Sequence, residues 1–175
     1  GHGRGECVQV PVAALGGSYH TAIKRSLRQF PSLSKGGGML LVGEVRDGES
    51  ASELVRAAVN GTLVFTTIHA SDPKTAVARL SALAAQTIGR EAANDLVASA
   101  IRLVFHQRLT MLPHESGWRR GRLGGEVLIN PHDASPAANN IRDGQFAQLN
   151  HTLAAQSRIL GRPHRPPFIE IAKEL

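Results

Sequence analysis

Apolar residues recur at helical spacing in several parts of the chain. The first part follows Ser18, which suits a helix N-cap, and stops at Pro31. The second follows Asp47, another candidate cap, and stops at Asn60-Gly61, where glycine accepts the left-handed conformation that closes many helices. The positions that carry the two periodicities are Tyr19, Ile23 and Leu27, then Ala51, Leu54, Val55 and Ala58. We therefore expect an amphipathic helix in each part.

Two longer helices are expected further along the chain. Asp72-Pro73 opens the first of them, because proline is favoured in the first helical turn. The second carries the strongest helical period in the sequence and is expected to reach Val104. The apolar positions are Ala76, Val77, Leu80, Leu83 and Ala84, then Ala93, Leu96, Val97, Ala100, Ile101 and Val104. Shorter helices are expected around Pro136–Ile141 and Phe146–Ile159.

Strands are expected between these helices. Met39–Val42 is a continuous apolar run, and Leu63–Ile68 is rich in β-branched residues. Neither run alternates with polar residues, which is typical of parallel strands covered on both faces. Alternating strands and helices predict an α/β fold with a parallel sheet. Gln107–Leu112 and Arg122–Ile129 flank a polar turn and predict an antiparallel hairpin.

Composition limits the class of protein. A chain of 175 residues with 42% hydrophobic and 19% charged residues suits a globular domain with its own core. No apolar run reaches the roughly 18 residues of a membrane span, because charged residues interrupt every candidate. Cys7 is the single cysteine, so an internal disulfide and a zinc site of several thiolates are excluded. We expect a reducing, cytoplasmic setting.

The basic balance keeps a second class of function open. Lys and Arg number 20 against 14 Asp and Glu, giving a net charge of +6. Such a chain can bind nucleic acid, an acidic partner or phosphate ligands, or can present a solvated basic face. Aromatic residues make up only 4%, which leaves few platforms for stacking single-stranded bases. The basic clusters are Lys24, Arg25 and Arg28, then Arg119, Arg120 and Arg122.

Candidate chemistry begins where the first predicted strand ends. Met39–Asp47 reads MLLVGEVRD, so Glu44 follows an apolar run and a glycine. In open α/β sheets, ligands bind beyond the carboxyl ends of the strands. A carboxylate there can hold Mg²⁺ through water, since this ion keeps several waters, and Gly43 would leave room for them. The alternatives are that Glu44 caps the next helix or pairs with Arg46.

The second predicted strand also runs into a polar residue. Thr66–Ala70 reads TTIHA and places His69 after the strand. If the two strands are neighbours, His69 and Glu44 share one edge of the sheet, where histidine can donate to a phosphate oxygen. The alternative is a structural histidine, one of 8 in the chain.

Taken together, the segments resemble the secretion ATPase superfamily that drives type IV pili, type II secretion and type IV secretion. LLVGEVRD resembles its Walker B motif and TTIHA its His box. The likeness runs from about Val8 to Gly161 and is greatest for the pilus-retraction, twitching-motility branch, since the chain lacks a tetracysteine insertion. Further matching segments are Leu27-Arg28-Gln29, Gln107-Arg108-Leu109, Glu126–Ile129 and Ile141–Gly144.

The resemblance implies a fold and a division of the chain. It implies the C-terminal portion of a RecA-like P-loop NTPase core: a mainly parallel sheet with flanking helices, an antiparallel hairpin and a C-terminal helical segment. Residues 1–130 would form the partial core with Walker B and the His box. Residues 131–161 would form the helical segment, and residues 162–175 a Pro-rich tail.

The resemblance also implies roles for individual residues. Glu44 would hold Mg²⁺ through water near the γ-phosphate of ATP, and His69 would couple nucleotide state to movement. Arg46 and Glu49 would support that loop and contacts between subunits, and Arg79 would lie near the nucleotide or a subunit boundary. The alternatives are a surface charge for Arg46, a first-turn acid favoured by the helix dipole for Glu49, and a solvated side chain for Arg79.

Partners follow from the same resemblance. The complete protein would be a cytoplasmic homohexamer, peripheral at the inner membrane, that binds ATP and a platform protein of a pilus or secretion machine, or DNA if conjugative. No G-x-x-x-x-G-K-[ST] phosphate loop occurs in the chain, and the family's acidic box is also missing. Both would lie before Gly1, so we expect the chain alone to be inactive. Thr62 stands where the family often has a second histidine. A non-catalytic relative remains an alternative.

Overall fold

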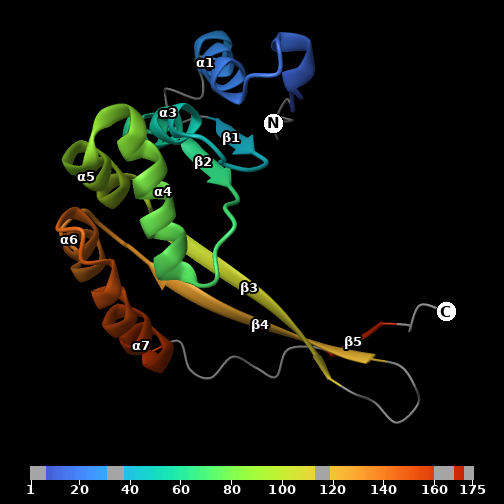
Figure 1. Ribbon diagram of the computed structural model, residues 1–175, viewed down its shortest axis with the longest axis vertical. Helices are drawn as coiled ribbons and strands as arrows, with labels where there is room; N and C mark the ends of the chain where they lie inside the picture. Colours follow the sequence, from blue (N-terminus) through green and yellow to red (C-terminus); the bar gives the residue numbers. More distant parts are fainter. Residues whose placement is uncertain (1–6, 31–37, 113–118, 160–167, 172–175) are drawn as a thin grey trace, which may run out of the picture.

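The computed structural model describes residues 7–30, 38–112, 119–159 and 168–171. Figure 1 shows a curved molecule, with α1 at one end, α3, α4 and α5 along its outer side, and a hairpin of β3 and β4 leading away from the other end. The elements are η1 Val12–Leu15, α1 Tyr19–Gln29, β1 Met39–Val42, α3 Gly48–Val59, β2 Leu63–Thr66, α4 Pro73–Ile88, α5 Arg90–Ala100, β3 Leu103–Leu112, β4 Arg119–Ile129, α6 Pro136–Arg142, η2 Phe146–Gln148, α7 Leu149–Ile159 and β5 Phe168–Ile171.

The strands form a parallel pair and an antiparallel sheet. β1 pairs with β2 in parallel, in a register that sets Met39 against Leu63 and Val42 against Thr66. β4 lies between β3 and β5 and pairs with both in antiparallel fashion. The predicted α/β fold class is therefore confirmed, with its parallel strands, flanking helices, hairpin and C-terminal helices. The Pro-rich tail expected over residues 162–175 falls outside the described residues except for β5, and so does most of the polar turn expected in the hairpin.

The predicted helix starts are confirmed by their caps. The Ser50 backbone N–H donates to Oδ1 of Asp47 at 2.7 Å, and the Thr75 N–H donates to Oδ1 of Asp72 at 2.8 Å. Ser18 caps α1 in the same way. Each cap satisfies a backbone donor that the first helical turn leaves without a partner. These caps fix where α3 and α4 begin, after the loops 43–47 and 67–72 that follow β1 and β2.

Two apolar clusters hold the elements together. One joins α1, β1, α3, α4 and α5 through residues such as Ile23, Val45 and Leu54. The other joins α3, α4 and α5 to β4, α6 and α7, and in it Leu128 and Ile141 are fully buried. This second cluster takes side chains from both sides of residue 130. The division of the chain at residues 130 and 161 stays a prediction.

The fourth predicted helix is wrong at its end. α5 stops at Ala100 instead of Val104, and β3 begins at Leu103 instead of Gln107. Ile101 has an extended backbone, and Leu103 and Val104 pair with Ile129 and Leu128 of β4. The side chains of Ile101 and Val104 fit a helical period, but cross-strand pairing next to buried Leu128 decides the conformation.

The expectation that both predicted parallel strands are covered on two faces is also wrong for this chain. Leu40 and Val64 pack against the helices, whereas Leu41 is 76% exposed and Phe65 is 49% exposed. Within the described part of the chain, α3 packs against β2 on one face of the strand pair, and Leu41 and Phe65 on the other face are exposed to solvent. β2 ends at Thr66, two residues earlier than predicted.

None of the helices in the described residues is long and apolar enough to cross a lipid bilayer.

Candidate functional site

The carboxyl ends of β1 and β2 lie side by side because the two strands are parallel and in register. Glu44 is two residues beyond Val42, the last residue of β1, and its side chain is only 17% exposed. The next residue, Val45, is 1% exposed and packs in the apolar cluster below the strand. The loop after β1 is thereby anchored in the core while the carboxylate stays at the edge of the sheet.

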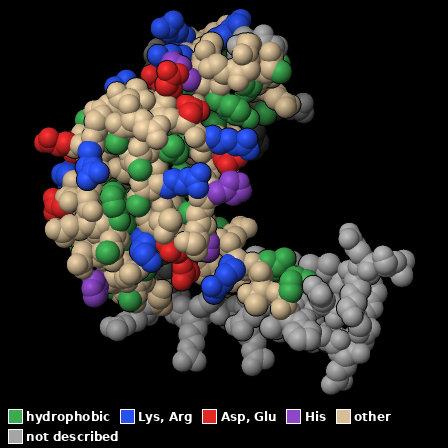
Figure 2. Space-filling model, viewed as in Figure 1, with side chains coloured by type: hydrophobic (Ala, Val, Ile, Leu, Met, Phe, Trp, Pro, Cys, Tyr) green, Lys and Arg blue, Asp and Glu red, His purple; other side chains and the backbone are tan. Residues whose placement is uncertain are grey.

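Glu44 contacts a histidine and an arginine side chain. Its Oε1 lies 3.3 Å from Nε2 of His69, which follows β2. Its Oε2 accepts a hydrogen bond from Nε of Arg46 at 2.6 Å and lies 2.5 Å from Nη2 of the same guanidinium in a salt bridge. The structure thus brings Glu44, His69 and Arg46 together at one edge, as expected from the two strand ends. Figure 2 shows basic, acidic and histidine side chains beside one another on the inner edge of the curve.

These contacts decide between the alternatives for Glu44. Asp47, not Glu44, caps α3, so the capping alternative is wrong, whereas the pairing with Arg46 is found. The Arg46 hydrogen bond lowers the pKa of Glu44, the charges of His69 and Arg79 act in the same direction, and desolvation opposes them. The same bond raises the pKa of Arg46. The carboxylate is therefore ionised and ready to accept hydrogen bonds or bind a cation.

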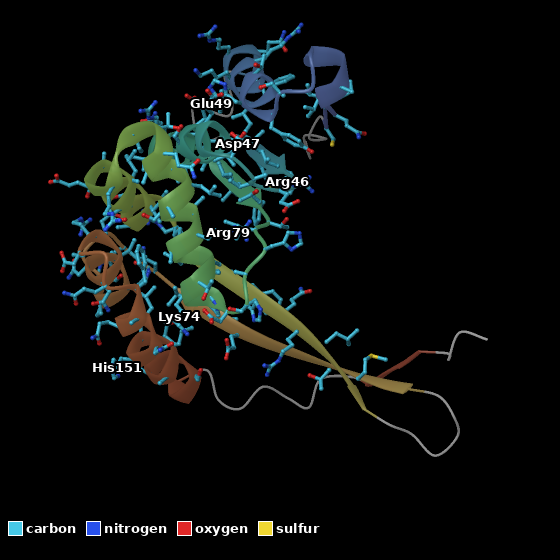
Figure 3. The ribbon with its side chains drawn as sticks, viewed as in Figure 1. Arg46, Asp47, Glu49, Lys74, Arg79 and His151 are labelled. Carbon is cyan, nitrogen blue, oxygen red and sulfur yellow. The ribbon has the colours of Figure 1, made fainter. Side chains whose placement is uncertain are left out.

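Arg79 reaches the site from α4. Its Nη1 donates to the backbone oxygen of His69 at 3.1 Å, so the guanidinium ties the loop after β2 to the helix that follows. Figure 3 shows Arg79 on the side of α4 nearest this loop, and Arg46 just beyond β1. His69 itself is 84% exposed. Its backbone is therefore held while its imidazole ring stays accessible to a ligand.

Glu49 lies apart from this cluster. It occupies the first turn of α3, and its Oε2 is 3.2 Å from Nδ1 of His20 on α1. Its side chain is 66% exposed. Figure 3 accordingly places Glu49 toward α1. The contact joins two helices, and an acid in the first turn suits the helix dipole. Its expected role in subunit contacts stays a prediction.

One residue of the site carried no functional signal in the sequence. The Thr67 hydroxyl donates to the backbone oxygen of Gly43 at 2.5 Å, and the Thr67 backbone oxygen accepts from the Val45 N–H at 3.0 Å. The sequence places Thr67 in a β-branched run and in the TTIHA segment that resembles the His box, but indicates no role for its own side chain. Its role depends on the register between β1 and β2, which no local pattern encodes.

The site suits a magnesium ion held through water. No group of three or more metal-ligating side chains occurs among the described residues, and at this edge of the sheet Glu44 offers an ionised carboxylate. Mg²⁺ takes few protein carboxylates and keeps several waters, so one oxygen donor group suits it. A Cβ added at Gly43 would meet nothing within 4 Å, so there is room beside Glu44 for a hydration shell.

The fold and this edge place the chain among α/β proteins that carry a ligand site at the carboxyl ends of parallel strands. A family model described as "Type II/IV secretion system protein" matches residues 6–153. The chain belongs to this family. The two strand-end segments that resemble the Walker B motif and the His box lie within this match, which covers most of the chain.

Individual relatives agree with this assignment. The chain is 30% identical over 138 residues to a twitching motility protein of Neisseria gonorrhoeae, covering 78% of this chain and 33% of that protein. It is 43% identical over 67 residues to competence protein ComGA of Streptococcus pneumoniae R6, covering 38% of this chain and 20% of the relative. The crystal structure of the pilus retraction motor PilT with bound ADP aligns with a TM-score of 0.60 at 27% identity, covering 81% of this chain and 36% of PilT. The chain therefore spans about a third or less of the length of these relatives.

Proposed function

We propose that this chain forms part of a motor ATPase that couples ATP hydrolysis to pilus retraction, pilus assembly or secretion. One observation carries the proposal: the Glu44 carboxylate lies 3.3 Å from the His69 imidazole at the carboxyl edge of a parallel strand pair. These are the segments that resemble the Walker B motif and the His box. The bound ADP named for the related PilT structure supports a nucleotide as the ligand.

The side chains at this edge of the sheet have different roles in the proposed reaction. Mg²⁺, when bound with ATP, neutralises charge on the phosphate oxygens. Glu44 accepts hydrogen bonds from the water around that ion, and the Arg46 hydrogen bond favours the ionised form of the carboxylate by lowering the pKa of Glu44. His69, with its exposed ring, donates a hydrogen bond to a phosphate oxygen and so transmits nucleotide state to β2. Arg79 holds the His69 backbone in place.

The other parts of the catalytic centre come from outside residues 1–175. The chain has no phosphate loop of the G-x-x-x-x-G-K-[ST] type, so the lysine and the backbone cradle for the phosphates must be supplied elsewhere. We propose a homohexamer with ATP at the subunit boundaries, where Arg46, Glu49 and Arg79 take part. The ring would work at the cytoplasmic face of the inner membrane with a platform protein, or on DNA in a conjugative machine. Residues 1–175 alone would not hydrolyse ATP.

The test uses the longest protein that the gene encodes. Glu44→Gln removes the negative charge but keeps the size of the side chain, and we expect the ATPase kcat to fall about 100-fold or more, with ADP binding retained. The matched control is Glu53→Gln. Glu53 is also 17% exposed and lies 3.5 Å from Lys24, but it belongs to α3, away from the strand edge. An unchanged rate for Glu44→Gln contradicts the proposal.

A second pair of variants tests His69. We expect His69→Ala to lower kcat by about tenfold or more while the affinity for ATP changes little, because the lost hydrogen bond serves the reaction and not the nucleotide base. His151→Ala is the control, since His151 lies on α7 beside a cleft that contains neither Glu44 nor His69 (Figure 3). Equal effects of the two substitutions would remove His69 from the site.

A further inference from the structure

Thr67 is bonded to the residues on both sides of Glu44. Its hydroxyl donates to the Gly43 carbonyl oxygen at 2.5 Å, and its own carbonyl oxygen accepts from the Val45 N–H at 3.0 Å. Glu44 stands between these two anchors, and its side chain contacts Arg46 and His69. A single residue after β2 therefore fixes the backbone that carries the carboxylate.

The two anchors differ in what else supports them. Val45 is 1% exposed and packs in the apolar cluster, so its position survives the loss of one hydrogen bond. Gly43 has no such support: nothing lies within 4 Å of the place where a Cβ would be, and glycine has more backbone freedom than any other residue. The space that suits hydrated Mg²⁺ thus leaves Gly43 without side-chain packing, and the Thr67 hydroxyl supplies a hydrogen bond to its carbonyl oxygen.

Thr67 also lies two residues before His69 in the same segment. The hydroxyl therefore sets the distance between the loop that carries Glu44 and the loop that carries His69. The backbone of the second loop is fixed again by Arg79, which donates to the His69 oxygen at 3.1 Å. Reacting groups need placement to within a fraction of an ångström, and an error of about 1 Å can lower a rate about 100-fold.

We propose that Thr67 is a positioning residue, whose hydroxyl holds Glu44 at its working distance from His69 and from the hydrated metal of a bound nucleotide. This inference rests on the proposed ATPase function. It concerns a residue that touches neither nucleotide nor metal and acts through the Gly43 backbone. A Thr67 without its hydroxyl leaves the fold in place but lets Glu44 move.

The first experiment measures the anchors without any nucleotide. In residues 1–175, ¹⁵N relaxation measured by NMR reports on the mobility of the Gly43 and Glu44 backbone. We expect Thr67→Val to lower the order parameters of these two residues from about 0.85 toward about 0.6, and Thr67→Ser to leave them unchanged. Thr66→Val is the control, because the Thr66 hydroxyl reaches the oxygen of Thr67 at 3.5 Å and not that of Gly43. Unchanged order parameters in Thr67→Val overturn the inference.

The second experiment measures turnover in the longest gene product. We expect Thr67→Val to lower kcat about tenfold with KM within twofold, and Thr67→Ser to keep more than half of the wild-type kcat. A packing role predicts the reverse order, since valine keeps the volume of threonine and serine does not; that order overturns the inference. Wild-type kcat in Thr67→Val beside an inactive Glu44→Gln also overturns it. A fully active Glu44→Gln instead refutes the proposed function.

Discussion

The Nε2 atom of His69 lies 3.3 Å from Oε1 of Glu44, although the two residues follow different strands. The parallel register, with Val42 opposite Thr66, is what brings the two strand ends together. A displacement of the loop after β2 therefore changes the surroundings of the carboxylate directly. Such a contact can link the state of a ligand at one strand end to movement at the other.

The hydrogen bond between Arg46 and Glu44 gives the first prediction. Because this hydrogen bond is the main cause of the lowered pKa of Glu44, Arg46→Gln should raise that pKa toward the ordinary value of a glutamate. Arg79→Gln should raise it less, since Arg79 acts only through its charge and is the weakest of the causes. Carbon-13 NMR of the Glu44 carboxyl group across a pH titration measures both. An equal shift in the two variants would show that the Arg46 contact is not formed in solution.

Asp72 gives a second prediction, about stability. Burial raises its pKa, but the hydrogen bonds from the Thr75 backbone and hydroxyl and the contact with Lys74 outweigh burial and lower the pKa to about 2. The unfolded chain has a value of about 3.9. The folded pKa is the lower one, so the stabilisation is present above about pH 4 and is lost as the pH falls toward 2. Asp72→Ala should cost about 1 kcal/mol of unfolding free energy at pH 7 and progressively less below pH 4.

Urea unfolding at several pH values measures the loss. Asp72→Ser is the matched control, because serine keeps an oxygen that can cap α4 but carries no charge. It should recover most of the stability at pH 7 and should show little of the pH dependence. A loss that stays constant between pH 7 and pH 3 would contradict the assignment of the cap to an ionised carboxylate.

How much of this was accessible from the sequence depends on the range of the interactions involved. The starts of three helices could be predicted from their N-cap residues, Ser18, Asp47 and Asp72, because a cap is a contact between residues three positions apart. Glu44 and His69 could be paired in advance because each follows an apolar run, and parallel strands end at one edge. The helix starts and the common edge of Glu44 and His69 can therefore be predicted from local patterns, without any contact between distant residues being known.

The predictions from the sequence are wrong where contacts between residues far apart in the chain determine the structure. Leu103 and Val104 leave the predicted helix because β4 offers them partners, and their own spacing fits either conformation. The open face of β1, with Leu41 76% exposed, could not be predicted, because an unbroken apolar run looks the same whether one face or two are covered. A positioning role for Thr67 could not be predicted either, because its hydrogen-bond partner Gly43 follows a different strand.

The two kinds of leucine in the strands lead to the last prediction. Leu128 of β4 is completely buried in the cluster that joins α3–α5 to α6 and α7, whereas Leu41 of β1 is 76% exposed. Leu128→Ala should therefore lower the unfolding free energy by about 2–5 kcal/mol, and Leu41→Ala by less than about 0.5 kcal/mol. Urea unfolding followed by circular dichroism measures both. If the cluster unites the residues on the two sides of position 130, Leu128→Ala shifts a single transition; a separate early transition of the C-terminal helices would show that residues 131–161 fold as a unit of their own.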